Sequence, residues 1–250
     1  MKILKYSILP ISFFLFIILV FFSSPYRQLR PYRIFGRNSD HSDQTESITV
    51  NGRQANLVTG TDAGESFYMD RIPVTISDYK KCIDSNICPA HHYRDQYDKY
   101  WDNPLYAILP VTFVTLNEEK AYCSSIGGDL PTLAQWEAAS GTGYGYEYAW
   151  GNEMPVISTA NVDGYYQSLT PAGWLPEGAS PFGILDMNGN MREWILDEDP
   201  TDPEGKGLKG GSFQDSFSSC KNDYTIYHLP TSAGFNRGFR CVYSLGQSSN

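Results

Sequence analysis

Acidic residues are absent from the first 37 positions, and basic residues are scarce in the rest of the chain. The first 37 residues hold six Lys or Arg, whereas the remainder holds 13 basic and 28 acidic residues, a net charge of −15. A body this acidic repels a phosphate backbone, so we expect no nucleic-acid partner. Only one apolar run is long and free of charge, which excludes a polytopic membrane protein.

Aromatic residues, glycine and proline are abundant, with 18 Tyr, 13 Phe, 5 Trp, 22 Gly and 15 Pro in 250 residues. Hydrophobic residues make up 41% of the chain, which excludes a disordered or collagen-like protein. This composition predicts a loop-rich core that is packed around aromatic rings rather than around long helices.

The apolar run extends from Tyr6 to Phe22. As a helix these residues would span about 26 Å, near the lower limit for crossing a bilayer. A cleaved signal peptide is the alternative, but bulky Phe22 and nearby Pro25 disfavour cleavage. We therefore predict that residues 1–24 form a membrane anchor or signal segment and that residues 25–47 form a flexible tether.

Two sequence features disagree about the side of the membrane on which the body lies. Two lysines precede the apolar run and four arginines follow it, which favours a cytoplasmic body. Cys82 and Cys88, six residues apart, suit a small disulfide loop, which persists in an oxidising compartment. Metal binding by this pair is disfavoured, because adjacent His91 and His92 do not complete a tetrahedral set. We expect a single-pass membrane protein with an extracytoplasmic domain.

Residues 48–245 contain no linker, repeat or change in composition, so we predict one domain. Its patterns predict few helices and short strands. We expect a strand at 67–69, helices at 78–85 after Ser77, after Asn117 and after Thr132 with a stop at Gly141, and strands near Trp194, at 211–213 and at 239–243.

Six segments in order resemble the formylglycine-generating enzyme family, also called the sulfatase-modifying factors. They are Phe67–Ile83 (FYMDRIPVTISDYKKCI), Asp129–Gly141 (DLPTLAQWEAASG), Tyr148–Asn152 (YAWGN), Pro181–Trp194 (PFGILDMNGNMREW), Lys209–Phe213 (KGGSF) and Asn236–Val242 (NRGFRCV). The resemblance implies an α+β domain with a variant of the C-type-lectin-like fold, low in regular secondary structure and stabilised by calcium. Because that fold hosts oxidases, an iron-dependent sulfoxide synthase module and non-catalytic binders, it does not by itself determine an activity.

The resemblance also implies a disulfide between Cys123 and Cys241, which match two structural cysteines of the family. The alternative is a pair of buried reduced thiols.

Activity depends on Cys220. In the family's oxidases, two cysteines after the GGS turn hold copper(I), which activates oxygen to oxidise a substrate cysteine to formylglycine. Counted from Ser212, Cys220 occupies the second of these positions and Asp215 the first. A carboxylate is a hard ligand that replaces a thiolate poorly for copper(I). Copper is therefore not expected, and Cys220 is interpreted as a part-buried free thiol, with capture of a partner's cysteine as the alternative.

The resemblance implies calcium at Asp186, Glu193 and the carbonyls of Gly189 and Met191. Carboxylates at both ends of a tight Asn-Gly turn suit a hard cation that takes six to eight oxygens. The alternative is a turn held by side-chain hydrogen bonds without metal. A second family site would begin at Asn161 and Val162, where Asp163 is the nearest carboxylate and the match is incomplete.

The remaining conspicuous residues are interpreted as structural. Trp136, Trp150, Trp194 and Phe239-Arg240 are predicted to lie in the core, with Arg240 paired to a carboxylate. Residues 196–205 are predicted to form a solvated acidic loop. His91, His92 and His228 lack ligand spacing, and no Ser/His/Asp arrangement or phosphate loop is present.

These observations lead to a membrane-anchored, extracytoplasmic module that binds a protein partner or a small-molecule ligand without catalysis. One alternative is a formylglycine-generating-type oxidase that acts through Cys220. Another is a structural subunit of a membrane complex.

Overall fold

The computed structural model describes residues 45–60, 63–89 and 101–246. The predicted anchor (1–24) and most of the tether (25–47) lie outside the described residues, as do His91 and His92. Within the described part of the chain, no helix is both long enough and apolar enough to cross a bilayer.

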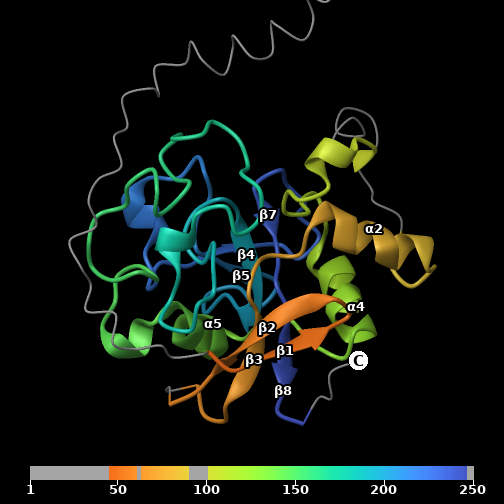
Figure 1. Cartoon of the computed structure of the whole chain (residues 1–250), viewed down its shortest axis with the longest axis horizontal. Coiled ribbons are helices and arrows are strands. Elements are labelled where there is room, and N and C mark those ends of the chain that lie inside the picture. Colours follow the sequence, from red (N-terminus) through yellow and green to blue (C-terminus); the bar gives the residue numbers. More distant parts are fainter. Residues whose placement is uncertain (1–44, 61–62, 90–100, 247–250) are drawn as a thin grey trace, which may run out of the picture. The chain divides into compact units, whose positions relative to one another are not determined.

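Two four-stranded sheets organise the domain (Figure 1). The first has the order β1-β2-β3-β8 and is antiparallel throughout. The second has the order β6-β5-β4-β7, in which β7 runs parallel to β4. The strands are β1 (Ser47–Val50), β2 (Arg53–Val58), β3 (Phe67–Asp70), β4 (Arg192–Glu198), β5 (Lys206–Lys209), β6 (Ile226–His228), β7 (Arg237–Gly238) and β8 (Val242–Ser244).

Three α-helices accompany the sheets in the described residues, and short 3₁₀ turns connect them. The α-helices are α2 (Ile76–Asp84), α4 (Leu116–Ser125) and α5 (Leu133–Ser140). The 3₁₀ turns are η2 (Pro104–Tyr106), η3 (Thr142–Tyr144), η4 (Pro176–Gly178) and η5 (Phe217–Cys220). Much of the chain between α5 and β4 forms ordered loops, as the composition predicted.

Each α-helix begins with a capping box, in which a threonine and the residue three positions later bond reciprocally. Thr132 was predicted correctly to begin α5, and Gly141, with φ of 91°, ends it in the left-handed conformation. The other two predicted starts were wrong. Thr75 rather than Ser77 caps α2, and Thr115 rather than Asn117 caps α4.

Two strand predictions also differ from the structure. The predicted strand at 211–213 lies after β5, because Gly210 and Gly211 take positive φ values of 81° and 69° and turn the chain. The predicted strand at 239–243 is present only from residue 242, where β8 begins, because residues 239–241 connect β7 of one sheet to β8 of the other. The strands at 67–69 and near Trp194 are present.

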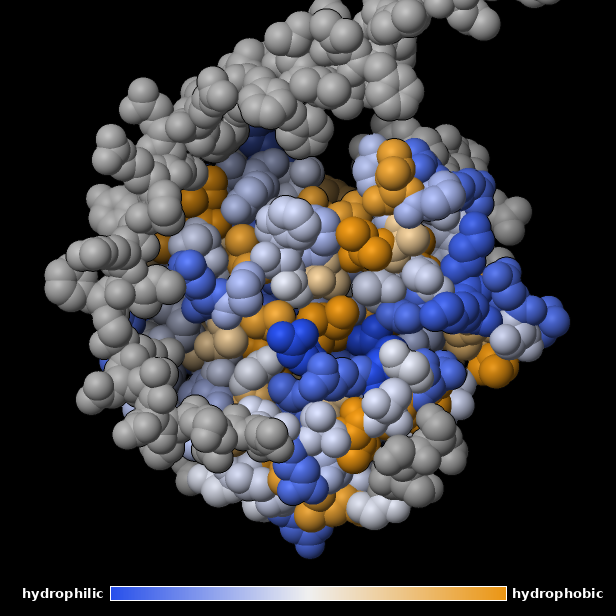
Figure 2. All heavy atoms as spheres, viewed as in Figure 1, coloured by the Kyte–Doolittle hydropathy of each residue, from blue (hydrophilic) through white to orange (hydrophobic). Residues whose placement is uncertain are grey.

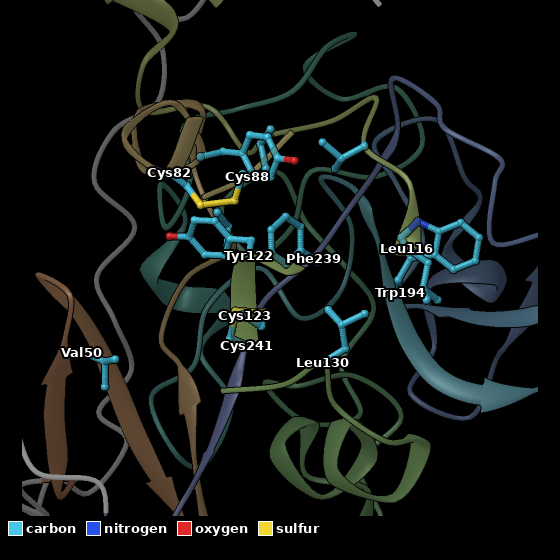
Figure 3. Packing of buried hydrophobic residues seen from close by; sticks show 14 of the residues in the cluster. Val50, Cys82, Cys88, Leu116, Tyr122, Cys123, Leu130, Trp194, Phe239 and Cys241 are labelled. Atoms are coloured by element: carbon cyan, nitrogen blue, oxygen red, sulfur yellow. A yellow bond between two sulfur atoms is a disulfide. The ribbon is translucent and has the colours of Figure 1, made fainter. Parts of the chain in front are cut away.

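Both predicted disulfides are present, and they bind the core together (Figure 3). Cys82–Cys88 closes a six-residue separation at the end of α2. Cys123–Cys241 joins α4 to the segment between β7 and β8. The rings of Tyr79 and Tyr122 stack at 5.8 Å, so α2 and α4 pack side by side. The core predictions for Trp136, Trp150, Trp194 and Phe239-Arg240 are confirmed by their burial.

Candidate functional site

The predicted site residues lie where the loop after β5 meets the start of β4. The KGGSF segment ends β5 and turns sharply into η5, which carries Cys220. A Cβ on Gly211 would lie 2.3 Å from the Cys220 sulfur, so only glycine allows this close approach. The fold therefore brings the turn and the free cysteine together, as the resemblance implied.

Cys220 is fully buried and is the free cysteine of the described chain. Its Sγ lies 4.0 Å from the carbonyl oxygens of Ser212 and Asp215. Burial, and next the neighbouring Asp215 carboxylate, raise the pKa of the thiol to about 12. At neutral pH the sulfur is therefore protonated, whereas a copper ligand or nucleophile would be the thiolate.

Asp215 makes an ion pair that the sequence did not reveal. One carboxylate oxygen contacts the guanidinium of Arg192 at the start of β4. The other accepts hydrogen bonds from the Ser212 N–H at 2.7 Å and the Ser212 hydroxyl at 2.8 Å. The carboxylate is thus neutralised and oriented by its own surroundings. With this carboxylate and a protonated thiol, the donor set does not fit copper(I).

The predicted calcium donors are brought together only in part. Asn161 contacts the Gly189–Asn190 turn, since its carbonyl accepts from the Asn190 N–H at 2.8 Å. A Cβ on Gly189 would lie 2.5 Å from the same carbonyl. The Asn161 Oδ1 is buried without a partner, whereas the carbonyl of Val162 accepts from the Tyr165 N–H at 2.9 Å. The Gly189 carbonyl in turn accepts from the Met191 N–H at 2.8 Å.

The two predicted calcium carboxylates differ in their environments. Glu193 accepts from Trp136 Nε1 at 2.9 Å and from Arg240 at 2.6 and 2.8 Å, which also confirms the predicted partner class of Arg240. Asp186 accepts from the Gly173 N–H at 2.6 Å, and no salt bridge to it occurs among the described residues. Burial raises its pKa to about 6. Glu193 is therefore already neutralised by Arg240, whereas Asp186 has no cationic side chain paired with it, and no cluster of three acidic, His or Cys side chains suited to a metal occurs among the described residues.

A pocket of about 620 Å³ is lined in part by Phe213 and Gln214, which follow the turn at Gly210–Gly211. None of its lining residues is charged. Aromatic and aliphatic side chains dominate the lining, and the Phe235 ring lies 6.4 Å from that of Phe113 and 6.0 Å from that of Phe213. Its polar lining residues are Thr112, Gln167, Ser168 and Gln214. Figure 2 shows apolar side chains gathered on the visible face beside η2 and the loop that follows it.

The pocket joins segments that are far apart in the sequence. Ile76 opens α2, Leu105 and Tyr106 belong to η2, and Gln214 directly precedes Asp215. Leu105 is 80% exposed. The sequence reasoning missed both this pocket and Arg192. The charged arginine between Met191 and Glu193 in the NMREW segment was a signal that could have indicated a partner for Asp215.

Comparison with known proteins identifies the family of this domain. A family profile described as "Sulfatase-modifying factor enzyme 1-like domain" matches residues 42–245. The "Inactive C-alpha-formylglycine-generating enzyme 2" of Mus musculus is 31% identical over 187 residues, which cover 65% of this chain and 61% of the relative. The "Formylglycine-generating enzyme" of Streptomyces coelicolor is 34% identical over 168 residues, covering 53% and 52%.

The chain thus spans about half to three-fifths of the length of these curated relatives. Among solved structures, CarF superposes with a TM-score of 0.60 at 18% identity, covering 80% of this chain and 98% of that one. PvdO from Pseudomonas aeruginosa gives 0.59 at 18% identity, covering 80% and 91%. At these identities the two structures establish the α+β fold alone.

Proposed function

Because the chain belongs to the sulfatase-modifying factor family, we propose that it uses the family's fold to bind a ligand or partner and does not oxidise protein cysteines. The observation that carries this proposal is the engagement of Asp215 by Arg192 and Ser212. An oxidase of this family needs a second soft donor beside Cys220, and a carboxylate held by an arginine is not one.

The state of Cys220 supports the same proposal. Its thiol is buried, and its pKa of about 12 leaves almost no thiolate at neutral pH. The pocket lined by Phe213 and Gln214, between Ser212 and Asp215 in the sequence, offers a non-catalytic use of the same region, because apolar pockets with a few polar groups are typical ligand sites. The mouse relative whose name includes "Inactive" is compatible with such a role.

We place this module outside the cytoplasm, anchored by residues 1–24. The support is the apolar run in the sequence together with two disulfides, which persist in oxidising compartments. Calcium at Asp186 and Asn161 is proposed as a structural ion, and no step of the binding function depends on it.

The test is a copper(I) titration of the full chain and of Asp215→Cys. We expect no stoichiometric copper(I) binding by the wild type, and binding by the variant, which restores two sulfurs. Each protein is then incubated with copper(I), oxygen and a peptide with the Cys-x-Pro-x-Arg motif, and the peptide is weighed by mass spectrometry. The wild type should leave the peptide thiol intact.

The contrary result is equally specific. Stoichiometric copper(I) binding by the wild type, abolished in Cys220→Ser and accompanied by loss of the peptide thiol, would establish the oxidase instead. Ser219→Ala, on the neighbouring residue of η5, is the matched control and should behave as the wild type does.

A further inference from the structure

Two arginines emerge from neighbouring strands beside the pocket. Arg192 on β4 and Arg237 on β7 are direct partners in the parallel pair, so their side chains leave the same face of the sheet. Burial, and next the charge of Arg192, lower the pKa of Arg237. The two guanidinium groups therefore interact across the strand pair.

Of these two positively charged side chains, only Arg192 has a carboxylate partner among the described residues. Arg192 is paired with Asp215, whereas no salt bridge to Arg237 occurs in the part of the chain that the structure describes. Arg237 donates from Nη1 to the hydroxyl and carbonyl of Ser232, which are neutral acceptors. Its Nε is buried without an acceptor. One positive charge and one donor are consequently left uncompensated.

His228 is also affected by the positive charges of the two arginines. Its pKa is lowered by burial and then by Arg237 and Arg192, so it is neutral at neutral pH. A half-buried site that carries two arginines, one aspartate and a neutral histidine favours an added anion.

Neither arginine is a lining residue of the pocket, but each is connected to lining residues through its chain neighbours. Asp215, the partner of Arg192, follows the lining residue Gln214. Arg237 lies two residues after the lining residue Phe235, and the Arg192 N–H donates to the Asn236 carbonyl at 2.9 Å. An uncharged, ring-lined pocket thus has a positively charged neighbourhood at one side.

We propose that Arg237, assisted by Arg192, binds the carboxylate of a ligand whose apolar body occupies the pocket. This inference rests on the proposed binding function and adds the charge and polarity of the ligand. Arginine binds carboxylates through paired N–H donors, and Arg237 has no carboxylate partner among the described residues.

Two matched probe pairs test the inference by calorimetry on the full chain. The first is 4-phenylbutyrate and its amide, and the second is N-acetyl-Leu-Phe with a free carboxylate and with an amidated end. We expect the acid of at least one pair to bind roughly 10-fold or more tightly than its amide, as charge-assisted hydrogen bonds imply. The pair that binds distinguishes a small acid from a peptide terminus.

Substitutions test which residues cause the preference for the acid over the amide. Arg237→Gln should abolish the preference for the acid, and Arg237→Lys should retain part of it. Asp215→Asn should tighten acid binding severalfold, because Arg192 loses its competing carboxylate. Lys120→Gln removes an exposed charge on α4 that does not line the pocket, and it should leave the preference unchanged.

The possible failures are distinct. If acid and amide bind equally well, the pocket is a ligand site but the carboxylate assignment is wrong. If neither member of either pair binds at millimolar concentration, the binding function proposed above fails with it. If Arg237→Gln unfolds, which circular dichroism would reveal, the opposite changes expected for Arg237→Lys and Asp215→Asn still decide the matter.

Discussion

Glu119 on α4 has no exposed surface, and neither of its carboxylate oxygens has a hydrogen-bond partner among the described residues. Burial, followed by the charges of Glu118 and Glu193, raises its pKa well above the ordinary value. The folded protein therefore holds this proton more tightly than the unfolded chain does. Its contribution to stability is present below the ordinary Glu pKa and is lost as the pH rises.

Glu119→Met should consequently stabilise the domain. Met has a similar volume and needs no hydrogen bond, so the free energy of unfolding at pH 8 should rise by roughly 1–3 kcal/mol. The gain should be smaller at pH 5, where the wild-type carboxyl is protonated in more of the unfolded chain. Urea denaturation at both pH values measures the difference.

The neighbouring residue supplies the control. Glu118 is also acidic and buried, but its Oε2 accepts from the Thr115 N–H and hydroxyl, both at 2.7 Å. Glu118→Gln weakens this capping box and should lower stability, by up to about 1–2 kcal/mol. A Glu119→Met protein that is less stable than the wild type at pH 8 would mean that Glu119 has a stabilising partner, and the argument would fail.

Asp186 is a second residue whose pKa is raised by folding. Burial raises it from the ordinary 3.8 to about 6 in the folded protein. The stability it contributes is complete below about pH 4 and is lost as the pH rises through 6, with an upper limit on the order of 3 kcal/mol. Asp186→Asn should flatten this part of the stability profile. Thermal unfolding between pH 4 and 7, with chelator present, measures the effect.

The same profile tests calcium. Calcium bound to the Asp186 carboxylate would favour its charged form, so the loss between pH 4 and 6 should disappear in millimolar calcium and return in EDTA. Asn161→Ala, which removes the unpartnered Oδ1, should weaken the response to calcium. A profile that is identical in calcium and EDTA would contradict the calcium proposal but leave the titration of Asp186 intact.

At the scale of elements, the two disulfides reduce the conformational entropy of the unfolded chain by different amounts. Cys123–Cys241 spans 118 residues and Cys82–Cys88 spans six. From loop-closure entropy, the long loop stabilises the folded protein by about 5 kcal/mol and the short loop by about 2 kcal/mol, both as upper figures. Cys123→Ala with Cys241→Ala should therefore lower the free energy of unfolding more than Cys82→Ala with Cys88→Ala.

Denaturant unfolding of the two double variants measures the ranking, and the intact mass before and after reduction counts the oxidised sulfurs. Four oxidised sulfurs and one free thiol are expected. A larger loss from the short loop would mean that packing of the buried Cys82 and Cys88 side chains in the core, rather than chain entropy, dominates. An oxidised Cys220 would contradict the pairing itself.

The helix boundaries indicate how much of the local structure the sequence could predict. The existence of all three helices followed from short polar caps and glycine stops. Two starts were misplaced by two residues because Ser77 and Asn117 are good caps in isolation. The competing signals, Thr75 with Asp78 and Thr115 with Glu118, are two-sided capping boxes, and the second bond decides the position.

Over the whole molecule, ordered motifs were sufficient to predict the fold, whereas the partners of the site residues were not predictable. Asp215 was recognised as the residue in the place of a thiolate, but Arg192 lies 23 positions earlier and meets it only through the turn after β5. Likewise, Glu193 was assigned to calcium and Arg240 to an unnamed carboxylate, although the fold pairs the two. Such pairings depend on how strands are ordered in the sheet, which no spacing in the sequence reveals.

The proposed membrane location has its own test on the full chain. Residues 1–24 should keep the protein in the membrane pellet after alkaline carbonate extraction, and the domain should be digestible by protease added outside the cytoplasm. Leu15→Arg with Leu19→Arg places two charges in the apolar run, each costing about 2.5–3.5 kcal/mol at the centre of a membrane helix, and should release the protein. Leu15→Ile with Leu19→Ile is the control that retains hydrophobicity.

Alkylation of thiols in intact cells determines the side of the membrane independently. A cytoplasmic domain would expose reduced Cys82 and Cys88, whereas an extracytoplasmic one would protect them as a disulfide. A carbonate-soluble protein whose mass lacks the first residues would identify a cleaved signal peptide and would remove the anchor from the proposal without affecting the binding site.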